Sequence, residues 1–241
     1  MWKKIILGCL LLPTYLLAQN QPAFSEDYHT MWLRGMLIYR TKWANYQFEG
    51  LFRQQENEFA PPYWAGPNNP LAAPLIRGLR FWAVYNTSKR WRMDFATSWF
   101  GTYPTIRAAT DVGKPYLNDF RLTFLPLYTY RINRLEISSR TGGEIMFIYP
   151  HRFDSLTIRQ RFRIRPMLKY KVAPQLWASI FDEFFVSTTT NGLRYDQHRP
   201  AGMLHFEPKT NHFLEGGVFV NYKPNEVTHG ITWLLYYNRF F

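Results

Sequence analysis

Hydrophobic and polar residues alternate with a period of two along most of this chain. The segment Ile158–Val172 is the clearest case, because one set of alternate positions is basic and the other is largely apolar. The basic set holds Arg159, Arg161, Arg163, Arg165, Lys169 and Lys171, and we call the four arginines the arginine ladder. Successive side chains of a β-strand point to opposite faces. The pattern therefore predicts a strand with one charged face and one apolar face.

Eleven segments of this kind are predicted as strands, and helical periodicity is hard to find anywhere. They are Met31–Arg40, Trp43–Gln55, Arg77–Asn86, Trp91–Tyr103, Phe120–Ile132, Leu135–Ile148, Ile158–Val172, Leu176–Ser187, Gln197–Glu207, His212–Tyr222 and His229–Phe241. Short turns near residues 41, 88, 133, 174 and 209 alternate with longer loops near 56–76, 104–118, 149–156 and 188–196. The short loop Lys223–Thr228 is the exception. Outer-membrane barrels have this asymmetry, with short periplasmic turns and longer outer loops.

Two all-β architectures compete for this pattern. A soluble exported sandwich would bury the apolar faces in a core, whereas a membrane barrel would turn them to lipid and the charged faces to a lumen. Because apolar faces recur on nearly every strand, the sequence favours an antiparallel transmembrane β-barrel of roughly 10–12 strands. Twelve is the best expectation, since bacterial barrels usually have an even number, and residues 19–30 would form the twelfth strand or pass through the lumen. Pro126 and Pro166 predict bulges, because each lacks the backbone N–H that would donate to the neighbouring strand.

The N-terminus has the features of a secretory signal peptide. Two lysines precede an apolar run that ends at Leu17, and Ala18 supplies a small residue at the cut. We therefore divide the chain into a signal peptide, residues 1–18, and a single outer-membrane domain, residues 19–241. Too few apolar residues precede Cys9 for it to mark a lipoprotein. Cleavage after Ala18 would remove this single cysteine, and with it any disulfide or thiolate chemistry.

The charge and aromatic content narrow the expected partners. The formal net charge is +12, and 19% of the residues are aromatic. After the signal peptide no stretch approaches the length of apolar run that a membrane helix needs, which excludes membrane-spanning helices. In an exported protein the basic charge points to anionic lipids and anionic solutes rather than to nucleic acid. We expect the protein to lie in the cell outer membrane of a Gram-negative bacterium, with outer-membrane lipid and lipopolysaccharide as partners.

The C-terminus ends on an aromatic carboxylate. One face of the last predicted strand carries Trp233, Leu235, Tyr237 and Phe241. This face resembles the terminal strand of outer-membrane proteins, which the barrel-assembly machinery recognises as an added strand. Arg239 departs from the apolar residue usually found two positions before the end. The assembly machinery is therefore an expected partner during biogenesis.

The last third of the chain carries a recognisable pattern. The run Arg194–Phe206 is followed by the Gly-rich strand Leu214–Tyr222, and the arginine ladder and the pair Asp182-Glu183 precede both. These segments resemble the domain-of-unknown-function 2490 family, common in Bacteroidetes-type Gram-negative bacteria. His198 stands where that family more often has Asn. The resemblance implies an outer-membrane β-barrel, and it brings no established activity or catalytic residue.

The arginine ladder has two interpretations. Together with Arg140 and Lys169 it could line an anion path, because arginine suits carboxylate and phosphate groups and basic rings select anions in pores. Alternatively, acidic residues on neighbouring strands could neutralise it inside a narrow lumen. The candidate lumen acidic partners are Glu136, Glu144 and Glu183, and Glu49 and Asp94 are further candidates. We expect internal salt bridging.

No catalytic residue, metal site or cofactor is predicted. A hydrolase would need a nucleophile with a histidine partner, and Ser155, Ser179 and Ser187 lack neighbouring partners in the sequence. His205 and His212 flank a turn and could meet across a hairpin, but a third metal ligand is missing.

The adjacent carboxylates Asp182 and Glu183 cannot both face the lumen in a regular membrane strand. Adjacent residues face opposite ways, so one carboxylate would point at lipid, and the sequence does not assign which. With no stronger chemistry present, we expect an outer-membrane barrel with a structural or surface role and no enzymatic activity. A small anion-favouring, porin-like pore is the alternative, and a lipid-modifying enzyme is a more distant one.

Overall fold

A computed structural model describes residues 28–55, 71–106, 110, 112, 114–150, 155–189, 192–224 and 230–241. Its strands are β1 Tyr28–Arg40, β2 Ala44–Gln55, β3 Ala73–Asn86, β4 Trp91–Thr102, β5 Leu117–Ile132, β6 Leu135–Tyr149, β7 Thr157–Ala173, β8 Leu176–Thr189, β9 Gly192–Lys209, β10 His212–Asn221 and β11 Gly230–Phe240. In this described part of the chain, no helix is long and apolar enough to cross a membrane. The predicted signal peptide, residues 1–18, lies outside the described residues.

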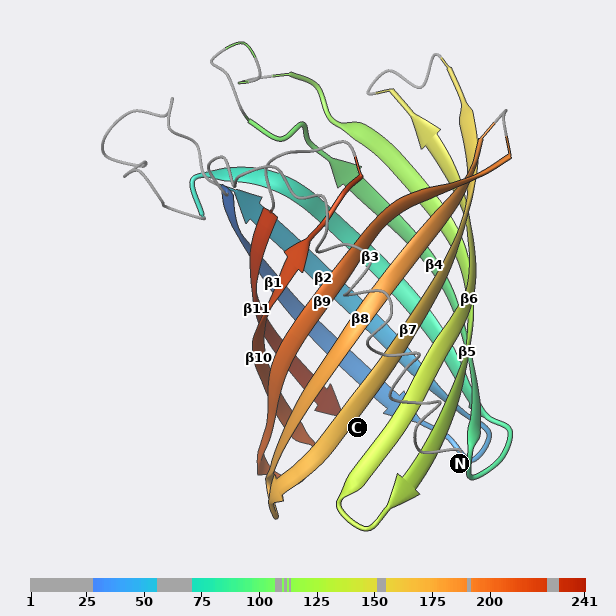
Figure 1. Cartoon of the computed structure of the whole chain (residues 1–241), viewed down its shortest axis with the longest axis vertical. Coiled ribbons are helices and arrows are strands. Elements are labelled where there is room, and N and C mark those ends of the chain that lie inside the picture. The colour runs from blue at the N-terminus through green and yellow to red at the C-terminus, as the bar shows by residue number, and fades with distance from the viewer. Residues whose placement is uncertain are drawn as a thin grey trace.

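The strands form one closed barrel, tilted against its long axis (Figure 1). Each strand pairs antiparallel with its sequence neighbour, and the barrel closes where β1 pairs with β11 in parallel, from Tyr28 opposite Gly230 to Ile38 opposite Phe240. Eleven strands joined in sequence leave the first and the last running in the same direction, so this pair has to be parallel. The prediction of an all-antiparallel barrel is therefore wrong at this seam. The predicted twelfth strand is not confirmed, since β11 occupies the edge of β1; residues 19–27 lie outside the described residues.

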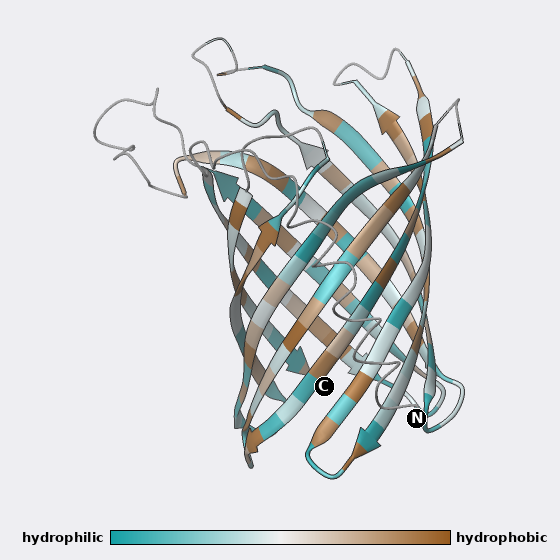
Figure 2. Cartoon of the chain, in the orientation of Figure 1, coloured by the Kyte–Doolittle hydropathy of each residue, from teal (hydrophilic) through white to brown (hydrophobic). Residues whose placement is uncertain are grey.

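The predicted alternation is confirmed in the two faces of the wall. On β2, Phe48 and Phe52 are each 50% exposed, whereas Glu49 and Arg53 between them are 2% and 5% exposed. Figure 2 shows hydrophobic and hydrophilic segments alternating along the strands. In a closed barrel the buried set faces the lumen and the exposed set faces outward. The interior also has two small apolar clusters, Trp82, Val84, Ala96 and Leu125 on one side and Met203, Phe219 and Leu234 on the other.

The connections differ in length between the two ends of the barrel. Tight turns follow β1, β3, β5, β7 and β9, and the last strand ends at this same rim, where the Phe241 N–H donates to Ile38 O at 2.8 Å. Four of the connections at the opposite end are longer, and three of them, after β2, β4 and β6, were predicted to be long. The predicted loop 188–196 is wrong, because β8 and β9 extend through nearly all of it and leave only residues 190–191 between them. The connection after β10 is longer than predicted, from Tyr222 to residue 229.

The two strand prolines do not produce the predicted bulges. The β5–β6 pairing is interrupted next to Pro126 and resumes in the same register, from Phe124 opposite Gly143 to Leu127 opposite Arg140. Pro166 keeps its partner on β6, while the pairing of β7 with β8 is interrupted there without a shift. Each proline therefore interrupts the backbone hydrogen bonds with only one of its two neighbouring strands. The register that positions the lumen side chains is preserved.

Candidate functional site

A group of ion pairs joins inward side chains of the neighbouring strands β5 to β8 at the middle of the arginine ladder, and we call it the lumen ion-pair cluster. Its centre is Glu144 on β6, whose exposed fraction is only 4%. Arg161 donates to the Glu144 carboxylate at 2.5 Å, and Arg163 lies 3.3 Å from the other carboxylate oxygen. Arg163 also lies 3.6 Å from Glu183 on β8, and Arg121 on β5 lies 4.0 Å from Glu144. One carboxylate thus neutralises arginines from two neighbouring strands.

Further acidic side chains extend these contacts around the lumen. Asp94 on β4 lies 2.7 Å from Arg92 and 3.0 Å from Arg140. Glu49 on β2 accepts a hydrogen bond from the Trp82 indole at 2.8 Å and lies 3.4 Å from Arg80. Asp119 pairs with Arg121. Glu49 and Asp94 therefore engage arginines of the wall beside the ladder rather than the ladder itself.

Aromatic rings fill space between these charges. The Phe185 side chain is fully buried, and the guanidiniums of Arg161 and Arg199 each lie 4.7 Å from its ring centroid. Arg199 also donates to Asn221 at 3.0 Å. A cation over an aromatic face is attracted by the ring quadrupole. These contacts therefore fix the arginine side chains against neighbouring strands of the wall.

The other predicted lumen residues lie at the two ends of the ladder. Arg159 pairs with Asp196 at 2.9 Å, next to Ser187. Asp196 sits at a register shift between β8 and β9, which no alternation pattern revealed. Toward the opposite rim, Arg165 lies over the Phe181 ring at 5.1 Å and Lys169 over the Trp177 ring at 5.4 Å. Glu136 faces the lumen near the turn after β5, but its ion pair is with the exposed Arg131, at 2.6 Å, rather than with the ladder.

The structure assigns the two carboxylates that the sequence left open. Glu183 faces the lumen, and Asp182 points outward, where the His198 Nδ1 lies 3.0 Å from its carboxylate. The imidazole of His198 is stacked between the rings of Phe184 and Tyr222, with centroids 5.4 Å and 4.9 Å away. Only 6% of His198 is exposed. The outward carboxylate therefore has a partner, and aromatic rings shield that partner.

A serine, a histidine and a glutamate form a hydrogen-bonded series that the sequence did not reveal. Ser179 Oγ lies 2.7 Å from His205 Nε2, and His205 Nδ1 lies 2.8 Å from Glu215 Oε1. Arg34 on β1 holds the other oxygen of Glu215 at 2.8 Å. The prediction that Ser179 lacks a partner is wrong, because pairing of β8, β9 and β10 brings three inward positions together. The alternation pattern could have placed these three side chains on the lumen face. Only the pairing register of the strands shows that they touch.

The hairpin that joins β9 and β10 does not form the histidine pair considered from the sequence. His205 faces inward to Ser179 and Glu215, whereas His212 contacts the Tyr237 hydroxyl at 2.9 Å. Among the described residues, no group of three or more His, Cys, Asp or Glu side chains is arranged to hold a metal ion.

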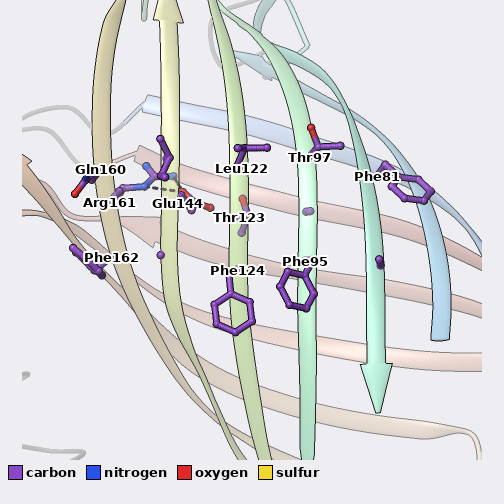
Figure 3. Close-up of a pocket in the computed structure, with 14 residues that line it drawn as sticks. Phe81, Phe95, Thr97, Leu122, Thr123, Phe124, Glu144, Gln160, Arg161 and Phe162 are labelled. Carbon is purple, nitrogen blue, oxygen red and sulfur yellow. Dashed lines mark hydrogen bonds and ion pairs between the residues drawn. The ribbon is translucent and has the colours of Figure 1, made fainter. Parts of the chain in front are cut away.

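The outer wall over β3–β7 is hollowed, with a volume of about 730 Å³ (Figure 3). Outward aromatic and aliphatic side chains form most of its lining, namely Phe81, Phe95, Leu122, Phe124, Ile145 and Phe162. Small residues make room between them, namely Ala83, Thr97 and Gly143. The linked Glu144 and Arg161 also border the hollow.

The C-terminal residues proposed as an assembly signal share the outward face. Trp233, Leu235, Tyr237 and Phe241 are between 40% and 58% exposed. Arg239, the residue that departs from the usual pattern, lies over the Phe241 ring at 4.6 Å. A cation–π contact thus gives this charged side chain an aromatic partner at the barrel rim.

No protein-family model matches the chain, and no curated protein or solved structure matches it at a significant level. The resemblance to the domain-of-unknown-function 2490 family therefore stays a prediction.

Proposed function

We propose that the chain is an outer-membrane β-barrel with a structural or surface role, whose lumen is closed by the ion-pair cluster. The observation that carries this proposal is the polarity of the wall. Large apolar side chains are exposed on the outward faces of all eleven strands, while carboxylates and guanidiniums are buried inside. A soluble monomer rarely exposes so continuous an apolar surface, whereas a membrane barrel needs it as an apolar band.

The ion pairs support a closed lumen rather than an open pore. An eight-stranded barrel is filled by its side chains, and aqueous channels occur in barrels of about 16–18 strands. An eleven-stranded barrel is closer to the first case. Arg159, Arg161 and Arg163 each have a carboxylate within 4 Å. An anion-favouring pore is less well supported, because these arginines would have to release their carboxylates to meet a passing solute.

The remaining parts of the proposal follow from the sequence. Residues 1–18 direct export and are removed, the assembly machinery of a Gram-negative bacterium recognises β11, and lipid and lipopolysaccharide cover the outward face. The hollow over β3–β7 suits acyl chains, since its aromatic and aliphatic lining offers them dispersion contacts.

Fractionation tests the location. The full chain, expressed in a Gram-negative host, should be recovered in the outer-membrane fraction and should migrate differently on gels with and without boiling, as closed barrels do. Recovery in the soluble periplasm after osmotic shock, with the same mobility in both samples, would end the membrane proposal.

A second candidate function, acyl-ester hydrolysis, is favoured by one observation, the series Ser179–His205–Glu215. Serine hydrolases place a nucleophile, a base and an orienting carboxylate in this order and at these distances. With His205 protonated on Nδ1, its Nε2 would take the Ser179 proton as Oγ attacks an ester carbonyl. The imidazolium would return the proton to the leaving alcohol, and water would then cleave the acyl-enzyme. The same contacts also serve as a structural network across three strands, and Ser179 is only 4% exposed.

A fluorophosphonate probe separates these two roles, because it reacts covalently with an activated serine. If the series is catalytic, the folded barrel in detergent is labelled, and Ser179→Ala abolishes the labelling. Ser187→Ala is the matched control, since Ser187 is also buried in the lumen but bonds to Asp196 instead of a histidine. A folded barrel that stays unlabelled, or is labelled equally after Ser179→Ala, rules out the hydrolase.

A further inference from the structure

The arginine ladder is neutralised unevenly along its length. Arg159 and Arg161 have carboxylates at 2.9 Å and 2.5 Å. Arg165, two positions beyond Arg161 on the same face, has no carboxylate of any described residue within 4 Å, and its guanidinium lies over the Phe181 ring at 5.1 Å. Arg165 is half-buried, and a charge withdrawn from water needs a partner to offset the lost hydration. The Arg165 end of the ladder therefore carries positive charge that no described protein group neutralises by direct contact.

Like charges gather around Arg165. The strand register places it directly opposite Arg140 on β6, and like charges at such cross-strand positions repel. Arg163 is its neighbour on the same face of β7, ~6.6 Å away by strand geometry. Arg34 on β1 is a weaker repulsive charge acting on Arg165, and Glu183 on β8 is the carboxylate that attracts Arg165 most strongly. Four guanidiniums from three strands thus converge on one part of the lumen.

Two of the three nearby carboxylates, Asp94 and Glu215, already have hydrogen-bond partners of their own. Asp94 accepts two hydrogen bonds from Arg92, at 2.7 and 2.8 Å, besides its contact with Arg140. Glu215 is held by both His205 and Arg34. Glu183 lies 3.6 Å from Arg163, too far for a hydrogen bond, and its buried Oε1 has no hydrogen-bond donor among the described residues. One carboxylate oxygen is therefore left to face the four guanidiniums around Arg165.

Three of the four arginines have an unmet hydrogen-bonding group. The Nε atoms of Arg34, Arg140 and Arg163 are buried and have no hydrogen-bond partner in the described part of the protein. A buried donor without an acceptor costs roughly 1–3 kcal/mol, and more when it is charged. An anion at this position would supply both the missing charge and the missing acceptors.

We propose that Arg140, Arg163 and Arg165, with Arg34 from β1, bind an oxyanion of the phosphate class inside the lumen. A tetrahedral phosphate offers acceptors in several directions and carries enough charge for several guanidiniums, whose planar forks match its oxygens. The site is a binding site within a closed barrel, and it shares Arg163 with the lumen ion-pair cluster around Glu144. It goes beyond the structural role proposed above and does not require conduction.

The test measures the unfolding temperature of the full-length folded barrel in detergent with rising inorganic phosphate, against chloride and acetate at equal ionic strength. Phosphate should raise the midpoint in a saturable way, and chloride and acetate should not. Isothermal titration with phosphate should show binding that Arg165→Gln weakens at least tenfold. In chloride, Arg165→Gln should unfold no earlier than the unsubstituted protein, because it removes repulsion rather than a partner.

Arg131→Gln is the control, since Arg131 is an exposed arginine outside the lumen site, and it should respond to phosphate like the unsubstituted barrel. Arg140→Gln gives a second variant should Arg165→Gln fail to fold, and it should also lose the response. Equal stabilisation by acetate would overturn the assignment to phosphate. A barrel that phosphate does not stabilise beyond chloride, or Arg165→Gln protein that responds in full, would overturn the site.

Discussion

Replacing Arg161 and Arg163 together with glutamine should lower the free energy of unfolding of the barrel by about 3–5 kcal/mol, the range for a buried ion pair that loses one side. The reason is the carboxylate they leave behind. Glu144 is 4% exposed and takes its two nearest cations from these residues, at 2.5 and 3.3 Å. The remaining cation, Arg121, is 4.0 Å away and is shared with Asp119. Urea unfolding in lipid vesicles measures this loss of stability. The temperature above which the folded form is no longer seen on gels is a second measure.

Two further variants show whether charge is the cause. Adding Glu144→Gln to the double variant removes the stranded carboxylate, so it should restore part of the lost stability. Arg131→Gln breaks an ion pair in which the arginine side chain is 77% exposed, and it should change stability by less than about 1 kcal/mol. A double variant as stable as the unsubstituted barrel, with altered ion selectivity in planar bilayers, would instead show that these arginines line an open anion path.

Substitution of Arg165 is expected to affect stability in the opposite way to substitution of Arg161, so the two positions can be compared directly. Arg161 and Arg165 have the same residue type, the same strand and the same face. One is bonded to a carboxylate and the other faces a second arginine. Removing the first should destabilise the barrel, and removing the second should not. The sequence pattern alone treats the two positions as equivalent.

The inward and outward faces could be predicted because they depend on a local rule. A period of two assigned Phe48 outward and Glu49 inward on β2, and Glu144 inward on β6, without knowledge of any partner strand. The tight turns were equally local. The closure of the barrel was not, because no local pattern states which strand meets the first edge. An expectation of even strand number therefore added a twelfth strand where β1 pairs directly with β11.

The contacts within the lumen could be predicted only in part. Glu144 and Glu183 were among the candidate acidic partners of the ladder, but the inward direction of Glu183 and the arginine that each one meets depend on strand register. Asp196 reaches Arg159 at a register shift. Ser179 and His205 are separated by a hairpin and meet only once β8 and β9 are aligned. Composition and alternation carry no information about either alignment.

The orientation of β5 tests most directly whether the barrel spans a membrane. Cys9 is the single cysteine, so single-cysteine variants can be made in a Cys9→Ser background and spin-labelled one at a time after insertion into lipid vesicles. Phe120, Leu122 and Phe124 are 39%, 52% and 42% exposed, and Thr123 between them is 6% exposed. Oxygen concentrates in the hydrocarbon region of a bilayer, whereas a polar nickel chelate stays in water.

Collision rates of the labels with the two reagents distinguish lipid from water at each position. Labels at residues 120, 122 and 124 should collide often with oxygen and rarely with the nickel chelate, and the label at 123 should collide rarely with both, giving a period of two along the strand. A label at Ser88, on an exposed turn, provides the water reference. If the label at residue 122 collides with the nickel chelate as freely as the label at Ser88, the outward face is in water and the membrane barrel is contradicted.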